Sequence, residues 1–212
     1  MARVGFLVDG FNLYHSLRQV GAGAAPAGAR WLDLRALCDS YLPAIGRDDR
    51  LVRVSYFSAL AHFREAGHPG SLKRQAAYLA ALRATGVAVH LGRFKRRRLR
   101  CPHCASPWDR QEEKETDVAI AVTLLEDFAG DVYDTAVLVT GDTDLAPSVR
   151  AARRLYPHRE VSFLFPVGRK NKELSALVRR SFTIGPGRYE RHQLPSPVIG
   201  EFGRRIAKPA AW

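Results

Sequence analysis

The chain of 212 residues is long enough for one domain with a substantial core, and its 46% apolar composition is typical of a globular protein. No apolar run approaches the roughly 20 residues that span a bilayer, no cleavable signal pattern opens the chain, and three cysteines cannot form a closed disulfide framework, so we expect a cytoplasmic protein that does not enter membranes. The 33 Lys and Arg residues against 21 Asp and Glu give a net charge of +12, which favours a polyanionic partner, although a solvated basic surface would give the same count.

Apolar runs that alternate with amphipathic stretches predict an α/β fold. Five runs predict buried strands, at residues 3–8, 51–57, 87–92, 135–140 and 161–165. Helical spacing occurs between them, and in one helix the apolar stripe consists of Val118, Ala121, Val122 and Leu125. This order predicts a three-layer α/β/α sandwich with a mostly parallel central sheet. Ligands bind such folds at the carboxyl ends of the strands.

Two segments fall outside this alternation, at about residues 93–113 and at 185–212. We expect the first to be a loop or hairpin inserted into a domain of residues 1–184, and the second to be a C-terminal tail. The first segment opens with "RFKRRRLR", which has the composition of a groove that tracks a nucleic-acid backbone. The residues that we expect to bind nucleic acid in this segment are Arg93, Lys95, Arg96, Arg97, Arg98 and Arg100.

The motif "CPHC" follows the basic run and carries Cys101 and Cys104. Its spacing is that of half a zinc site, but a tetrahedral structural site needs four ligands and the chain has no second cysteine pair. Plain thiols at the tip of a hairpin are the main alternative, and a redox-active dithiol is a further one. The sequence leaves zinc, free thiols and redox chemistry open.

Aspartates follow two of the predicted strands. Asp9 ends the first run, whereas Asp142 and Asp144 follow the fourth; turn formation and helix capping explain each of them singly. Asp117 lies on a predicted helix, on the same side as the apolar Ile120. If these carboxylates converge, each pair at about 4 Å repels by about 4 kcal/mol at an effective dielectric constant of 20, and a bound Mg²⁺ or Mn²⁺ would offset that repulsion.

Three segments carry a family resemblance: "VDGFNLYHSL", "EEKETDVAIAVTLL" and "VLVTGDTDLAPSVRAARRL". They resemble the signature blocks of the NYN domain, a branch of the PIN-like nuclease superfamily, and "RYERHQLPSPV" in the tail is similar to the end of LabA-like members. The resemblance implies a PIN-like sandwich and metal-dependent RNA cleavage. It places the metal ligands at Asp9, Asp117, Asp142 and Asp144, adds Asn12 to the catalytic residues, and matches Lys114 to a basic residue that precedes the helical aspartate.

The predicted function is therefore that of a metal-dependent ribonuclease with Mg²⁺ or Mn²⁺ as cofactor. An RNA-binding or regulatory adaptor with a weakly active pocket is the alternative, and a phosphatase acting on small nucleotides fits the basic surface less well. RNA is favoured over DNA as the partner, and a homodimer is left open.

Overall fold

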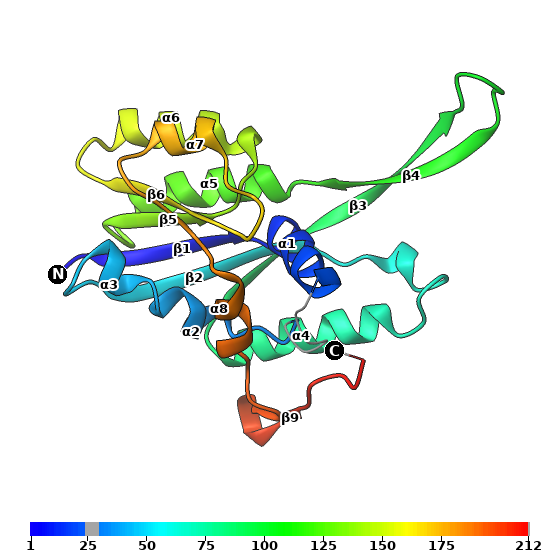
Figure 1. Cartoon of the computed structure of the whole chain (residues 1–212), viewed down its shortest axis with the longest axis horizontal. Helices are drawn as coiled ribbons and strands as arrows, with labels where there is room; N and C mark the ends of the chain where they lie inside the picture. The colour runs from blue at the N-terminus through cyan, green and yellow to red at the C-terminus, as the bar shows by residue number, and fades with distance from the viewer. Residues whose placement is uncertain (24–29, 212) are drawn as a thin grey trace.

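Seven strands form one central sheet in this computed structural model, which describes residues 1–23 and 30–211 (Figure 1). The spatial order is β4-β3-β2-β1-β5-β6-β7, and each neighbouring pair is parallel except β3 with β4. The strands are β1 (Arg3–Asp9), β2 (Arg50–Ala59), β3 (Ala88–Arg100), β4 (Pro107–Lys114), β5 (Thr135–Val139), β6 (Glu160–Phe165) and β7 (Ser181–Thr183).

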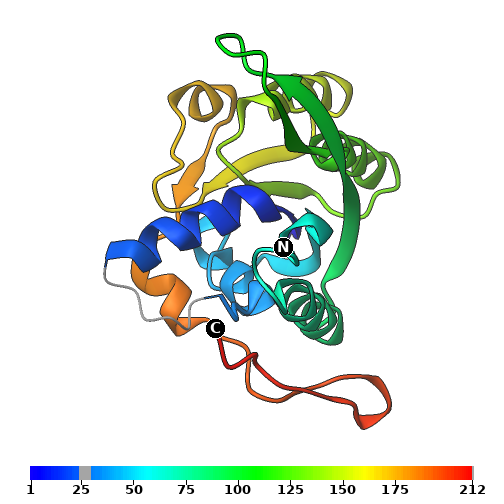
Figure 2. The ribbon, with the colours of Figure 1, turned by 90° about the vertical axis from the view of Figure 1, so that its right-hand side faces the viewer.

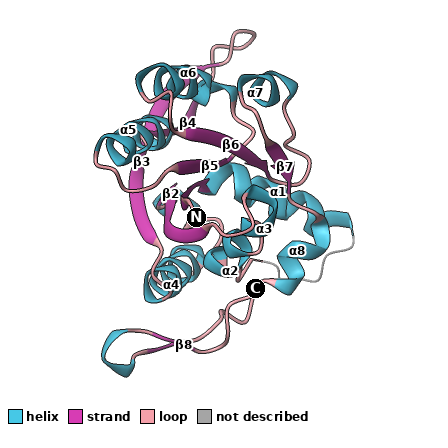
Figure 3. Cartoon of the chain, turned by 90° about the vertical axis from the view of Figure 1, so that its left-hand side faces the viewer, coloured by secondary structure: helices cyan, strands magenta, loops and turns pink. Residues whose placement is uncertain are grey.

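Helices cover both faces of this sheet, as Figures 1 and 3 show. One face carries α1 (Gly10–Gly23), α2 (Leu34–Asp39), α3 (Leu42–Ile45), α4 (Ser71–Ala84) and α8 (Pro186–Arg191). The other carries α5 (Thr116–Ala129), α6 (Ala146–Leu155) and α7 (Lys172–Leu177). Short elements complete the described chain: η1 (His62–Arg64), η2 (Thr143–Leu145), β8 (Val198–Ile199), η3 (Glu201–Gly203) and β9 (Arg205–Ile206). The predicted α/β/α sandwich is confirmed.

Strand β1 divides the interior into two cores because its side chains alternate between the faces. Phe6 and Val8 pack with α1, α2 and α4, whereas Leu7 packs with α5 and α6. Gly5 shares the second face, where a Cβ atom would lie 2.2 Å from the ring of Tyr133. The central strand is thus buried on both sides, which explains its continuous apolar sequence.

Helix α5 corrects one prediction from the apolar spacing. Val118 and Val122 were expected in its buried stripe, but their side chains are 66% and 45% exposed. The face against the sheet carries Ile120, Leu124 and Phe128 instead. Both sets repeat at helical spacing, so the period alone does not decide which of them faces the core. Among the described residues, no helix combines the length and the apolar character that a membrane span requires.

The basic segment forms a β-hairpin, and its first half continues a strand of the central sheet. Strand β3 continues from the sheet through residue 100 and pairs with β4 in register from Arg93↔Lys114 to Arg100↔Pro107. Figure 1 shows this ribbon projecting beyond the helices. The extension has no buried apolar run, so the apolar pattern ended the predicted strand at residue 92.

The C-terminal segment packs on the domain through buried side chains. Tyr189 in α8 is fully buried, and its hydroxyl lies 3.0 Å from Ser16 Oγ in α1. Trp31 Nε1 donates to the carbonyl oxygen of Pro195 at 3.1 Å, and Leu194 is buried nearby in the same core. These contacts join residues 186–195 to α1 and to the segment that precedes α2.

Candidate metal centre

The strand order reverses between β1 and β5, and the predicted aspartates lie at that point. Strands β2 and β3 follow β1 on one side of it, whereas β5, β6 and β7 lie on the other. Crevices at such reversals are the usual ligand sites of open parallel sheets. Figure 2 looks onto this edge of the molecule, where the chain leaves β1 into α1. Asp9 is the last residue of β1, and Asp142 lies three residues beyond β5.

Three of the four predicted metal ligands converge there. Asp9, Asp117 and Asp142 each offer a carboxylate oxygen, and the three oxygen atoms lie within 4.8 Å of one another. Asp9 is buried, whereas Asp117 and Asp142 are partly exposed. The aspartates come from a strand end, from the first turn of α5 and from the loop before η2. One buried and two partly exposed carboxylates therefore form a compact acidic group that solvent reaches.

Asp9 caps a helix in addition to facing the acidic group. Its Oδ1 accepts hydrogen bonds from the backbone N–H groups of Phe11 and Asn12, both at 3.0 Å, and its Oδ2 accepts one from Thr140 Oγ1 at 2.9 Å. Burial raises the pKa of Asp9, the three hydrogen bonds lower it, and the Asp142 charge raises it further; the net direction is upward. The capping role expected from the Asp-Gly pair and a ligand role thus fall on one side chain.

Thr140 links the two strand ends and was not predicted as a site residue. Its hydroxyl donates to Asp9 and accepts from the backbone N–H of Asp142 at 3.1 Å. The Asp142 side chain in turn accepts a hydrogen bond from the backbone N–H of Asp144 at 3.0 Å. Asp142 thereby caps the N-terminus of η2. The sequence did contain a signal for this role: Thr140 ends the apolar run and lies two residues before Asp142.

Asp144 lies beside the group rather than within it. Its side chain is exposed, and it is not one of the three aspartates whose oxygen atoms meet within 4.8 Å. Its charge still contributes to raising the pKa of Asp117, so the two carboxylates are close enough to interact. A direct role for Asp144 as a metal ligand stays a prediction.

Asn12 is fixed by the loop after β5. Its Oδ1 accepts a hydrogen bond from the backbone N–H of Gly141 at 3.1 Å, so the side-chain amide nitrogen is the group left for a ligand. A side chain at residue 141 would disturb this loop, since a Cβ there would lie 2.1 Å from the carbonyl oxygen of Arg169. The predicted role in holding a phosphate or a water therefore falls to the Nδ2 donor of Asn12.

The pKa of Asp117 is strongly raised by its surroundings. Burial and then the charges of Asp9 and Asp142 raise its pKa to about 6, with smaller contributions from Glu113 and Asp144. Within the described residues, no Lys or Arg forms an ion pair with any of the three aspartates. Convergent carboxylates without a cationic partner are a donor set for a divalent cation, and their hard oxygen atoms suit Mg²⁺ or Mn²⁺.

The predicted nucleic-acid contacts all lie on the β3–β4 hairpin. Residues 93–114 contain eight Lys and Arg residues against three acidic ones, so the ribbon stays strongly positive. Several of these cations form surface ion pairs, which contribute about 0–1 kcal/mol each and are easily exchanged for a phosphate. The pairs are Arg93–Glu115 at 2.8 Å, Lys114–Glu112 at 3.2 Å, Arg97–Glu112 at 3.5 Å and Arg96–Asp109 at 3.7 Å.

An aromatic contact fixes the base of the hairpin beside the acidic group. The ring of Phe94 meets Phe11 at 5.6 Å and Phe63 at 4.8 Å between centroids, both in edge-on geometry. Phe11 lies two residues beyond Asp9. Because side chains alternate along a strand, Arg96 shares the face of Phe94. The base of the cationic ribbon therefore lies beside the acidic group.

The two cysteines of the hairpin tip are free thiols. Cys104 Sγ lies 3.2 Å from Ser106 Oγ, and Cys101 is tied through its backbone to Ser106. Over the described ranges, the group of three or more metal-capable side chains is that of the aspartates, so a third ligand for zinc is not assembled around the cysteines. Both cysteines lie at the tip of the hairpin, and zinc binding and redox chemistry there stay predictions.

A family model for the NYN domain matches residues 3–183 of the chain. The chain belongs to the NYN domain family. The match covers the seven-stranded sheet and all three aspartates of the acidic group, and it agrees with the resemblance of the three sequence segments. Membership in this PIN-like nuclease family supports a hydrolase acting on nucleic acid as the general class.

Two further proteins are similar over most of the chain. A curated relative, 6-hydroxy-3-succinoylpyridine 3-monooxygenase HspA from Pseudomonas putida (strain DSM 28022 / S16), is 25% identical over 248 residues, covering 99% of this chain and 75% of that protein. A crystal structure of VPA0982, a protein of unknown function from Vibrio parahaemolyticus RIMD 2210633, matches with a TM-score of 0.54 and 20% identity, covering 91% of this chain and 96% of that one. The second likeness shows the shared fold.

Proposed function

We propose that this NYN protein is a metal-dependent ribonuclease. The single observation that supports this function is the convergence of Asp9, Asp117 and Asp142, whose carboxylate oxygens meet within 4.8 Å at the reversal of strand order. These residues would hold Mg²⁺ or Mn²⁺, with Asp144 beside them. A divalent cation at this position would supply charge neutralisation at a phosphate and an activated water. Placement in the LabA-like branch, from the tail segment, belongs to the same proposal.

Other side chains would position the metal ligands and bind the phosphate and the nucleic-acid strand. Asp9 is held rigidly by its three hydrogen bonds, so its position does not depend on the ligand. The Asn12 amide nitrogen donates to a phosphate oxygen or to a water, because its carbonyl oxygen is engaged by Gly141. The hairpin cations and Lys114 hold the strand, and RNA is the favoured strand on the resemblance to the family.

A cleavage assay tests the proposal. Labelled single-stranded RNA, duplex RNA and single-stranded DNA are incubated with the full chain in Mn²⁺, Mg²⁺ or EDTA. We expect cleavage of RNA in the presence of metal, none in EDTA, and at least a hundredfold loss in Asp142→Asn, since one ligand of the ion is then neutral. Asp109→Asn on the exposed hairpin serves as the matched control, because it removes one carboxylate outside the acidic group.

Two results would redirect the assignment. Tight RNA binding without cleavage, unaffected by metal, supports the regulatory adaptor instead. A second candidate function is oxidation of a small aromatic acid, and the 99% coverage by the monooxygenase relative is the observation that favours it. Oxygen uptake with 6-hydroxy-3-succinoylpyridine and an added reductant, in the absence of any nuclease activity, would support that candidate.

A further inference from the structure

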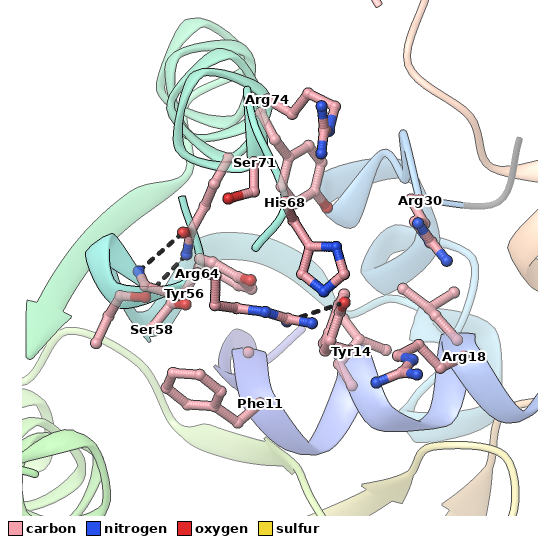
Figure 4. Close-up of a pocket in the computed structure, with 17 residues that line it drawn as sticks. Phe11, Tyr14, Arg18, Arg30, Tyr56, Ser58, Arg64, His68, Ser71 and Arg74 are labelled. Atoms are coloured by element: carbon pink, nitrogen blue, oxygen red, sulfur yellow. Dashed lines mark hydrogen bonds between the residues drawn. The ribbon is translucent and has the colours of Figure 1, made fainter. Parts of the chain in front are cut away.

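A hollow lies beside the acidic group, between α1, the end of β2 and α4. Its volume is about 350 Å³, which is the size of a small-ligand site, and Gly10 and Phe11 form part of its wall (Figure 4). These residues directly follow Asp9, so the hollow adjoins the acidic centre through one turn of chain. Asp9, Asp117 and Asp142 are not among the residues that line it.

The lining carries a concentration of positive charge. Arg18, Arg30, Arg64 and Arg74 contribute guanidinium groups from four different segments, and His68 adds an imidazole. Of the described residues that line the hollow, none is acidic. The four arginines also form no ion pair within the described part of the chain. Four guanidinium groups around one hollow repel one another, and an anion removes that repulsion.

The neighbouring carboxylate of Glu65 mainly serves the start of α4. Glu65 Oε1 accepts from the backbone N–H of Gly70 at 2.6 Å, and Glu65 Oε2 accepts from Leu72 N at 2.9 Å and from Ser71 Oγ at 3.1 Å. These three hydrogen bonds lower its pKa and direct the carboxylate to the start of α4. Glu65 is absent from the lining, and of the four arginines only Arg74 is among the causes that lower its pKa. Glu65 therefore orders the helix and compensates Arg74 in part, while the lining itself carries no carboxylate for Arg18, Arg30 or Arg64.

Aromatic and hydroxyl groups complete the lining. Tyr14, Tyr56 and Tyr78 border the space, and Phe11 flanks it on the α1 side. Arg64 Nη1 donates to Tyr14 Oη at 3.4 Å, which fixes one guanidinium toward the cavity wall, as Figure 4 shows. Aromatic faces beside guanidinium groups are the surface on which single-stranded nucleic acids stack their bases.

We propose that this hollow binds a terminal nucleotide through its phosphate monoester. A monoester carries nearly two negative charges at neutral pH, whereas an internal diester or a carboxylate carries one, so four arginines favour the monoester. A hollow of this volume also holds one end of a strand better than its continuing backbone. The choice of nucleic acid as the source rests on the proposed function, but the binding itself does not require cleavage.

The test measures binding in EDTA, with both the wild-type chain and Asp142→Asn. Single-stranded RNA oligonucleotides of one sequence carry a 5′-phosphate, a 3′-phosphate or hydroxyls at both ends, and free UMP serves as competitor. We expect one phosphorylated end to bind at least about tenfold more tightly than the hydroxyl oligonucleotide, because one added charge-assisted hydrogen bond is worth that factor. The preferred end identifies the strand terminus, and competition by UMP at equal concentration assigns the free nucleotide instead.

Matched variants separate the hollow from general charge. Arg64→Gln with Arg74→Gln removes two lining cations, whereas Arg50→Gln with Arg83→Gln removes two exposed cations outside the lining. We expect only the first pair to abolish the preference for the phosphorylated end, with melting temperatures measured for both. Equal affinity for all three oligonucleotides overturns the proposal, as does an equal loss in both double variants. Displacement by the aromatic carboxylate nicotinate but not by UMP also overturns it, whether or not RNA is cleaved with metal.

Discussion

Thr140 Oγ1 donates a 2.9 Å hydrogen bond to the buried Oδ2 of Asp9, and this contact ties the ends of β1 and β5 together. The same hydroxyl accepts from the backbone N–H of Asp142. Thr140 lies 131 residues beyond Asp9 in the chain, and its side chain links Asp9 to the backbone of Asp142. The geometry of the acidic group rests on this threonine.

Replacing Thr140 by valine keeps the shape of the side chain and removes the hydroxyl. We expect Thr140→Val to lower the free energy of unfolding by about 1–3 kcal/mol, because a buried carboxylate oxygen loses its donor. Thr140→Ser retains the hydroxyl, so its free energy of unfolding should fall distinctly less than that of Thr140→Val. Urea unfolding of both variants in EDTA measures the difference. An equal loss in valine and serine variants would assign the effect to packing of the methyl group.

Asp142→Asn tests whether the acidic group is a metal site, independently of any substrate. Without metal, removing one of three like charges relieves repulsion, so the variant should melt at the same or a higher temperature than wild type in EDTA. With Mn²⁺ at about 100 times its dissociation constant, wild type should gain about 2.7 kcal/mol, or roughly 5 to 10 °C. The variant should lose most of that gain. If millimolar Mn²⁺ does not raise the melting temperature of wild type, the aspartates are not a metal site and Asp9 acts only as a helix cap.

The sequence predicts the sheet and the convergence of the aspartates for the same reason. Central parallel strands are continuous apolar runs, and the residues that end them meet at one edge of the sheet. Asp9 and Asp142 could therefore be placed together from their positions in the chain. Asp117 could be added because helical spacing aligns it with the buried Ile120.

The remaining features depend on tertiary contacts that no local pattern carries. Strand β3 runs on through the basic segment because β4 pairs with it and because Phe94 packs against Phe11 and Phe63. Likewise, the cationic hollow takes its arginines from positions 18 to 74, and no spacing rule joins them. The packing of α1 against β2 and of α4 against β3 and η1 assembles that site.

The raised pKa of Asp117 should make the stability of the metal-free protein depend on pH. Its pKa in the folded state, raised to about 6, lies above that of the unfolded chain, so between about pH 4 and 6 the folded state holds a proton that the unfolded state has lost. The stability from this group is therefore greatest at low pH and is lost as the pH rises through 6. We expect Asp117→Asn to flatten this part of the curve.

Urea unfolding in EDTA from pH 4.5 to 7.5 measures the difference between wild type and Asp117→Asn. The difference matters because other groups titrate in the opposite sense: Arg3 holds the pKa of Asp134 well below its usual range. In Mn²⁺ the sign reverses, since protons compete with the metal and affinity should fall below pH 6. Parallel curves for the two proteins would show that Asp117 does not carry the raised pKa.

The hairpin arginines should supply binding rather than chemistry. They extend along a projecting ribbon, and only its base, at Phe94, touches the region of the aspartates. We expect the triple variant Arg96→Ala, Arg97→Ala and Arg98→Ala to weaken RNA binding and to lower the slope of log K against log salt by about one to three units, one for each phosphate that the variant no longer neutralises. We give a range for the change in slope because Arg96 and Arg97 already form ion pairs with Asp109 and Glu112.

A matched triple variant controls for net charge: Arg50→Ala, Arg83→Ala and Arg205→Ala remove three exposed cations outside the hairpin. Binding is measured by titration between 50 and about 200 mM salt in EDTA, so that cleavage does not intervene. The control should keep its slope within about half a unit, because cations bound to phosphates, not total charge, release counterions. An unchanged slope in the hairpin variant, or an equal drop in the control, would show that the ribbon does not track the nucleic-acid backbone.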